Sequence, residues 1–214
     1  MVVQRDPLPT GNLTVYSQND EERVILNYFD GKPAGTFLDI GAYNPKKFSN
    51  TRALFERGFK GVYVEPSPSL HQAFLDEIKD DPQMQLITDC IGPDAGEVEF
   101  YDSGEWALST TDPDWVEKRK GCGATFNTIK VNMITVPQLL EKSVHKTFDF
   151  ISLDTENTVK VILPLLDLNA LKTSLICVEW NSQDFAFFDD TLRAQGFVEI
   201  DGSRTGENLI YSKK

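Results

Sequence analysis

The stretch Phe37-Leu38-Asp39-Ile40-Gly41-Ala42-Tyr43-Asn44-Pro45, followed by Gly61-Val62-Tyr63-Val64-Glu65-Pro66, decides the fold of this chain. Each segment has the apolar run of a buried strand and ends in an acidic residue or a glycine-bearing turn. Residues 49–57, which lie between them, have the apolar spacing of a helix. A strand, a helix and a second strand in this order predict the front half of a site for a nucleotide-like cofactor.

The same alternation continues along the chain. Residues 69–79 predict a helix, and residues 85–89 predict a third strand. Three βα units in succession favour a parallel, doubly wound sheet. Residues 148–154 and 174–180 predict two further central strands, and both run into acidic residues at their carboxyl ends.

The C-terminal part differs in kind. A helix is predicted at residues 183–195, and two strands at 196–200 and 208–212 are joined by a short turn, which indicates an antiparallel hairpin. The sequence therefore predicts an α/β fold whose doubly wound, mostly parallel sheet is closed by a C-terminal antiparallel hairpin. This is the Rossmann-like shape of class I methyltransferases, whereas a dinucleotide-binding domain normally continues in parallel.

The length of 214 residues predicts a single domain over residues 1–214. Residues 1–35 form its helical lead-in, and residues 102–127 read as an inserted loop or lid. Within that insertion, Asp112 and Pro113 have the residue types of a helix start. Two tryptophans of the insertion, Trp106 and Trp115, either line a substrate mouth or anchor the loop on the core.

Composition excludes several classes of partner. The 21 basic and 33 acidic residues give a formal charge of −12, which argues against a groove for nucleic acid. No apolar run approaches the roughly 18 residues of a membrane span, and residues 1–7 lack the apolar region of a signal peptide. Cys90, Cys122 and Cys177 are odd in number and have no CxxC spacing, so a disulfide framework or zinc site is not expected. We expect a cytoplasmic protein with no membrane partner.

The first turn discriminates between cofactors. A dinucleotide fingerprint needs three glycines, and alignment of Gly41 with the first places Tyr43 at the second and Lys46 at the third. The tyrosine side chain would obstruct the approach of the backbone to a pyrophosphate. A nicotinamide-dependent oxidoreductase is therefore the alternative rather than the leading hypothesis.

S-adenosylmethionine has no pyrophosphate and therefore requires different protein groups for its binding. Glu65, at the end of the second strand, can accept hydrogen bonds from two ribose hydroxyls. Gly41 permits close passage of the chain, and amides at residues 49–51 are expected to meet the methionine carboxylate. Asp89 follows the third strand and is expected to receive the adenine amino group.

Several motifs in order then make the chain resemble the FkbM family of S-adenosylmethionine-dependent methyltransferases. They are Tyr16-Ser17-Gln18, Phe37-Leu38-Asp39-Ile40-Gly41-Ala42, Phe48-Ser49-Asn50-Thr51, Gly61-Val62-Tyr63-Val64-Glu65-Pro66-Ser67-Pro68 and Asp149-Phe150-Ile151-Ser152-Leu153-Asp154-Thr155-Glu156. The resemblance implies O-methylation of a hydroxyl on a small molecule or sugar. The predicted cofactor-binding residues are Asp39, Gly41, Ala42, Tyr43, Asn50, Glu65, Pro66, Ser67, Asp89 and Cys90.

Two positions depart from the family pattern. Pro45 stands where the family usually has a glycine, and Asn157 follows Glu156 where the family usually has Glu-Gly. These departures motivate a third hypothesis, in which the chain is a non-catalytic binding protein that retains the fold.

A hydroxyl acceptor calls for a general base. Asp154 and Glu156 are the predicted catalytic residues, because residues two apart in an extended segment point the same way. Together with Glu179 and Asn181 they also offer oxygen ligands for Mg²⁺. The family that the chain resembles is not typified by a metal, so the prediction is a site without one.

Overall fold

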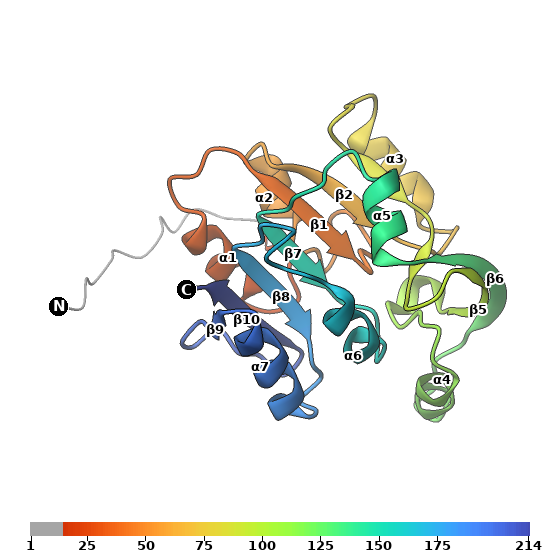
Figure 1. Cartoon of the computed structure of the whole chain (residues 1–214). Helices are drawn as coiled ribbons and strands as arrows, with labels where there is room; N and C mark the ends of the chain where they lie inside the picture. Colours follow the sequence, from red (N-terminus) through yellow and green to blue (C-terminus); the bar gives the residue numbers. More distant parts are fainter. Residues whose placement is uncertain (1–14) are drawn as a thin grey trace.

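A central sheet with the strand order β3-β2-β1-β7-β8-β10-β9 organises the computed structural model, which describes residues 15–214 (Figure 1). Five strands run parallel, and β10 is antiparallel to its neighbours on both sides. This confirms the predicted α/β sheet with its C-terminal hairpin. The strands are β1 (Thr36–Ile40), β2 (Lys60–Val64), β3 (Gln85–Ile87), β7 (Phe150–Leu153), β8 (Leu175–Glu179), β9 (Phe197–Glu199) and β10 (Asn208–Lys213).

Helices cover both faces of this sheet. On one face lie α1 (Glu21–Tyr28), α2 (Arg52–Glu56) and α3 (His71–Ile78). On the other lie α5 (Val136–Lys142), α6 (Val159–Ile162) with the 3₁₀ turn η2 (Leu163–Leu165), and α7 (Phe185–Ala194). Side chains of β1 alternate between the two cores, since Phe37 packs with the first set and Leu38 with the second. Across residues 15–214 no helix has the length and apolar content of a membrane span.

Local hydrogen bonds determine where two helices begin. In α2, the Ser49 hydroxyl accepts the N–H of Arg52 at 3.1 Å, so the predicted start of the helix becomes a turn. In α1, no side-chain cap from Asp20 is present, and the Ser17 hydroxyl accepts the N–H of Glu22 at 3.1 Å instead. Residues 1–14 lie outside the described part of the chain. They include the first part of the predicted lead-in at residues 1–35 and all of residues 1–7, where no signal peptide was expected.

A second sheet was not predicted. Its strands β4 (Cys90–Ile91), β5 (Gly96–Asp102) and β6 (Asn127–Ile134) pair in the order β4-β6-β5, and β5 and β6 form an antiparallel ribbon. Most of their side chains are at least partly exposed, so they lack the apolar signature of the central strands.

The insertion at residues 102–127 connects β5 to β6 and carries the 3₁₀ turn η1 (Gly104–Trp106) and α4 (Pro113–Lys120). Asp112 accepts the N–H of Asp114 at 2.8 Å and that of Trp115 at 3.4 Å, which confirms the predicted helix start.

One close contact fixes how the first turn meets the middle of the sheet. Gly41, which follows β1, has φ +81°, and a Cβ atom placed on it would lie 1.6 Å from the carbonyl oxygen of Asp154. The N–H of Asp154 in turn donates to the carbonyl of Ile40 at 2.9 Å. The ends of β1 and β7 therefore touch through their backbones, with no room for a side chain.

The contact at Gly41 predicts a large loss of stability for Gly41→Ala. Gly202 in the C-terminal hairpin is a matched control, because it also has a positive φ, +70°, but open space where a Cβ would lie. Gly202→Ala should cost about 1–2 kcal/mol for the left-handed backbone alone, and Gly41→Ala clearly more. Urea unfolding followed by circular dichroism measures both, and equal losses would contradict the steric contact.

Candidate functional site

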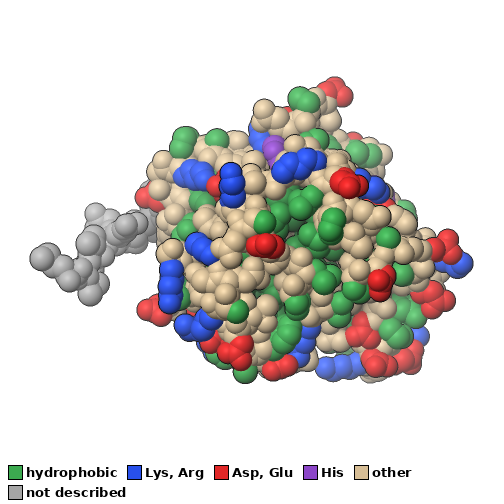
Figure 2. Space-filling model, viewed as in Figure 1, with side chains coloured by type: hydrophobic (Ala, Val, Ile, Leu, Met, Phe, Trp, Pro, Cys, Tyr) green, Lys and Arg blue, Asp and Glu red, His purple; other side chains and the backbone are tan. Residues whose placement is uncertain are grey.

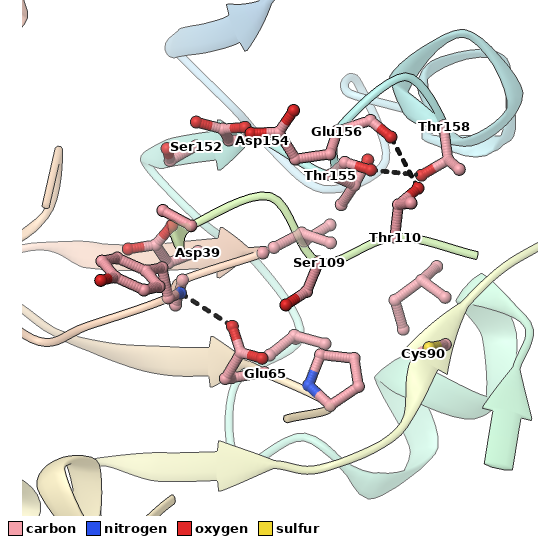
Figure 3. A pocket seen from close by; sticks show the side chains of 18 of the residues that line it. Asp39, Glu65, Cys90, Ser109, Thr110, Ser152, Asp154, Thr155, Glu156 and Thr158 are labelled. Carbon is pink, nitrogen blue, oxygen red and sulfur yellow. Dashed lines mark hydrogen bonds between the residues drawn. The ribbon is translucent and has the colours of Figure 1, made fainter. Parts of the chain in front are cut away.

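A cavity opens at the carboxyl edge of the central sheet, between the ends of β1, β2 and β7 on one side and the insertion on the other (Figure 3). Hydrophobic side chains gather toward the middle of the face shown in Figure 2, with charged side chains spread around them. All but two of the predicted site residues line the cavity: Asp39, Gly41, Ala42, Tyr43, Asn50, Glu65, Pro66, Cys90, Asp154 and Glu156.

Glu65 follows β2 and is held by the backbone. Its two carboxylate oxygens accept the N–H of Tyr43 and the N–H of Ser67, each at 2.8 Å. Figure 3 shows the first of these bonds. Burial raises the pKa of Glu65 to about 7, although both backbone bonds favour the ionised form. Ser67 does not line the cavity, and its contact with the site is this bond to Glu65.

Asp39, near the end of β1, ties the strand to the turn before α2. Its carboxylate accepts the Thr51 hydroxyl at 2.6 Å, and burial raises its pKa to about 6. Beside it, the Asn50 amide donates to the Ser152 hydroxyl of β7 at 3.2 Å. Asp39 and Asn50 thus line the cavity and also join β1, α2 and β7 around it.

The structure corrects the prediction for Asp89. Because β3 ends at Ile87, Asp89 lies in the connection to β4, where it accepts the Asn132 amide at 2.7 Å and the Lys142 ammonium at 2.5 Å. It does not line the cavity, so its expected contact with adenine is not supported. The neighbouring Cys90 does line the cavity.

Two of the three amides predicted to meet the methionine carboxylate, those of Ser49 and Thr51, form bonds within the protein. The Ser49 hydroxyl accepts the N–H groups of both Thr51, at 3.4 Å, and Arg52, at 3.1 Å. The N–H of Ser49 itself donates to the carbonyl of Tyr16 at 3.1 Å. These donors are therefore satisfied within the protein and do not point at a ligand.

Three carboxyl groups meet where β7 and β8 end. Asp154, Glu156 and Glu179 each offer an oxygen within 4.8 Å of the others, a set that a divalent cation can also occupy. Glu179 accepts the backbone N–H of Glu156 at 3.0 Å. Burial raises the pKa of Glu156 and of Glu179 to about 8, and burial together with Glu179 raises that of Asp154 well above its usual range.

The turn after β7 accommodates the departure at Asn157. Glu156 and Asn157 have φ of +47° and +67°, a conformation that glycine adopts freely and asparagine tolerates. The Asn157 amide also donates to the carboxylate of Asp112, at the start of α4. Asparagine therefore keeps the turn that glycine would allow and adds a bond to the insertion.

The insertion docks on the same turn. The Thr110 hydroxyl donates to the carbonyl of Glu156 at 2.7 Å (Figure 3). Trp115 is 3% exposed and lies under the Arg119 guanidinium at 3.9 Å, whereas Trp106 is 56% exposed. Neither tryptophan lines the cavity, so Trp115 anchors the insertion rather than forming a substrate mouth.

Within residues 15–214, Glu156 and two side chains of the insertion have polar atoms without hydrogen-bond partners. Glu156 Oε2, Trp115 Nε1 and Arg119 Nε are all buried without a hydrogen-bond partner in the described structure. Burial and Asp154 raise the pKa of Glu156, whereas the charge of Arg119 and the indole of Trp115 act in the opposite direction. The insertion thus acts on the chemistry of this side chain from outside the cavity.

Sequence reasoning missed several lining residues. Gln18 and Phe48 belong to motifs that carried the resemblance, but no role was assigned to them. Ser109, Thr110 and Thr111 lie in the insertion, whose irregular sequence gave no indication of which side chains face the cavity.

Comparison with known proteins agrees with this architecture. A protein from Escherichia coli described as the methyltransferase yhhF superposes with a TM-score of 0.50 at 12% identity, over 97% of this chain and 90% of that one. A protein from Haemophilus influenzae described as a methylase superposes with a TM-score of 0.51 at 13% identity, over 92% and 90% of the two chains. These likenesses show a shared class I methyltransferase fold.

Sequence comparison gives the family. No curated protein sequence matches this chain. The family model described as "Methyltransferase FkbM domain" matches residues 39–199, which hold the end of β1, the whole of β2, β7 and β8, and every carboxyl group of the cavity. The chain therefore belongs to the FkbM methyltransferase family.

Proposed function

We propose that this protein is an S-adenosylmethionine-dependent O-methyltransferase that acts on a hydroxyl of a small molecule or sugar. The observation that carries the proposal is Glu65, a buried carboxylate whose two oxygens are fixed by backbone N–H groups at the edge of the cavity. Each oxygen keeps a second lone pair, which suits it to accept from the two hydroxyls of a ribose.

The other lining groups fit the same cofactor. Gly41 lets the backbone pass without a side chain, and Ala42, Pro66, Cys90 and Ile91 supply the apolar wall that an adenine ring requires. Tyr43 occupies the position that a dinucleotide fingerprint reserves for glycine. This tyrosine supports S-adenosylmethionine over a nicotinamide cofactor.

Proton transfer falls to Glu156 in this proposal. The cofactor, when bound, supplies an electrophilic methyl group on a sulfonium. As the acceptor oxygen bonds to the methyl carbon and the bond between that carbon and the sulfur breaks, Glu156 would take the hydroxyl proton, so that a methyl ether and S-adenosylhomocysteine are the products. Its pKa of about 8 suits a base that works near neutral pH, and a cation in the cavity favours its ionised form.

Neighbouring groups hold Glu156 for this task. Glu179 binds its N–H, and Thr110 binds its carbonyl, so the backbone is fixed from both sides. Burial and the neighbouring Glu179 raise the pKa of Asp154 well above its usual range, which favours its protonated form. Glu156 is therefore better placed than Asp154 to accept a proton.

Ligand-induced stabilisation and turnover test the proposal together. S-adenosylhomocysteine should raise the melting temperature and NADH should not, because ligands that bind only the folded state stabilise it. Labelled S-adenosylmethionine with a panel of hydroxylated small molecules and sugars should then give a methylated product. Binding without any product would favour the non-catalytic alternative, and stabilisation by NADH alone would favour the oxidoreductase.

We predict that Glu65→Gln weakens S-adenosylhomocysteine binding by tenfold or more, since hydrogen bonds to a charged group contribute about 1.5–3 kcal/mol each. Isothermal titration calorimetry gives the dissociation constants. Glu141→Gln, an exposed glutamate on α5, is the control and should bind as the wild type does. Unchanged affinity in Glu65→Gln would contradict the ribose assignment.

Glu156→Gln should lower the rate of methyl transfer by about 100- to 10,000-fold, the usual contribution of a general base. Affinity for S-adenosylhomocysteine should stay close to that of the wild type. The wild-type rate should rise with pH up to the Glu156 value of about 8. Glu117→Gln, on the exposed side of α4, is the control and should keep the wild-type rate. Equal rates for the Glu117→Gln and Glu156→Gln variants would contradict the assignment of Glu156 as the base.

Stability should fall as pH rises toward 8. Asp39, Glu65, Glu156 and Glu179 have pKa values of about 6, 7, 8 and 8 in the folded protein, all above those of an unfolded chain. The folded state therefore binds more protons than the unfolded state over this interval, so the free energy of unfolding decreases with pH. Urea unfolding below pH 6 and above pH 8 measures the change, and Glu179→Gln should reduce it. A rise in stability would contradict the assignment.

A further inference from the structure

The cavity has no obvious partner for one end of the proposed cofactor. S-adenosylmethionine carries a carboxylate on its amino-acid part. Among residues 15–214, the cavity is lined by no lysine or arginine. Its charged lining residues are all acidic, namely Asp39, Glu65, Asp154 and Glu156. The amides of Thr51 and Arg52 are already bonded to Ser49. The described lining therefore offers this carboxylate no counter-charge, and a cation would have to come from the rim.

Lys47 supplies a cation at that rim. Its ammonium lies 5.7 Å from the ring centroid of Tyr43 and 5.0 Å from that of Phe48, and it donates to the Tyr43 hydroxyl at 3.5 Å. Tyr43 and Phe48 both line the cavity, and their rings stack at 6.3 Å. The ammonium is thus held beside two walls of the cavity by cation–π contacts.

The neighbouring cations are committed elsewhere. Lys46 pairs with Glu77, and Arg52 pairs with both Glu56 and Glu77. No carboxylate of the described residues lies within salt-bridge distance of Lys47, which is exposed. Of these three cations, Lys47 is the one whose charge is not already matched.

The turn that carries Lys47 is built in a costly conformation. Tyr43 and Phe48 have φ of +50° and +58°, which bulky residues rarely adopt. The Asn44 side chain holds the turn by accepting the N–H groups of Lys46 and Lys47, each at 2.9 Å. Pro45, whose ring fixes its φ, lies between Asn44 and Lys46. Pro45, which departs from the family pattern, is therefore part of the turn that positions Lys47.

We propose that Lys47 binds the carboxylate of the amino-acid part of the cofactor. The inference rests on the proposed function, because it requires an S-adenosyl amino acid in the cavity. It assigns the turn at residues 43–48 to the amino-acid end of the ligand, while Glu65 holds the ribose.

Two ligands that differ in this carboxylate test the proposal. S-adenosylhomocysteine has it, whereas 5′-methylthioadenosine keeps the adenosine and the sulfur but lacks the amino-acid group. By calorimetry, Lys47→Met should bind S-adenosylhomocysteine about tenfold more weakly, the effect of losing one charge-assisted contact. Its affinity for 5′-methylthioadenosine should equal that of the wild type.

Matched variants complete the experiment. Lys46→Met removes the adjacent lysine, which pairs with Glu77, and should alter neither affinity. Lys47→Arg keeps the charge and should retain most of the binding. Equal effects of Lys47→Met on both ligands, or none on S-adenosylhomocysteine, would overturn the inference while leaving the methyltransferase proposal intact. If the wild type binds neither ligand, the proposed function itself fails.

Discussion

The contact between Gly41 and the carbonyl oxygen of Asp154 is the constraint on which the site depends. It brings the turn after β1 against the end of β7, so this turn and the acidic residues Asp154 and Glu156 line the same cavity. A side chain at position 41 would push these strand ends apart and with them Glu65 and Glu156. The site is therefore assembled by the packing of the backbone, and its side chains take their places from it.

Burial of several carboxyl groups is the main electrostatic cost of this arrangement. Glu65 is compensated by two backbone N–H groups, and Asp39 by the Thr51 hydroxyl. In the cluster of Asp154, Glu156 and Glu179, burial and the neighbouring carboxyl groups raise the pKa of all three side chains. Raised pKa values from burial and like charges are typical of functional sites. A positively charged ligand would relieve this repulsion, which agrees with the sulfonium of the proposed cofactor.

The fold was largely predictable because its signal is local. Buried parallel strands such as Thr36–Ile40 are continuous apolar runs, and the rule for open α/β sheets places their ends at one edge. The ribbon of β5 and β6 escaped because its exposed side chains leave little apolar periodicity. Asp89 was misplaced because the end of β3 lies two residues earlier than its sequence indicates. Contacts between distant segments, such as Thr110 with Glu156, have no signature in either segment alone.

The docking of the insertion divides the site into two halves with different freedom to change. Beyond β5 and the insertion itself, the side chains of Thr110 and Asp112 bond to the turn at Glu156 and Asn157, while Glu65 is held by Tyr43 and Ser67 without them. The segment between β5 and β6 can therefore vary in length and in the side chains it turns inward, provided that it keeps its hold on that turn. One wall of the cavity can in this sense change while the ends of β1 and β2 keep their arrangement.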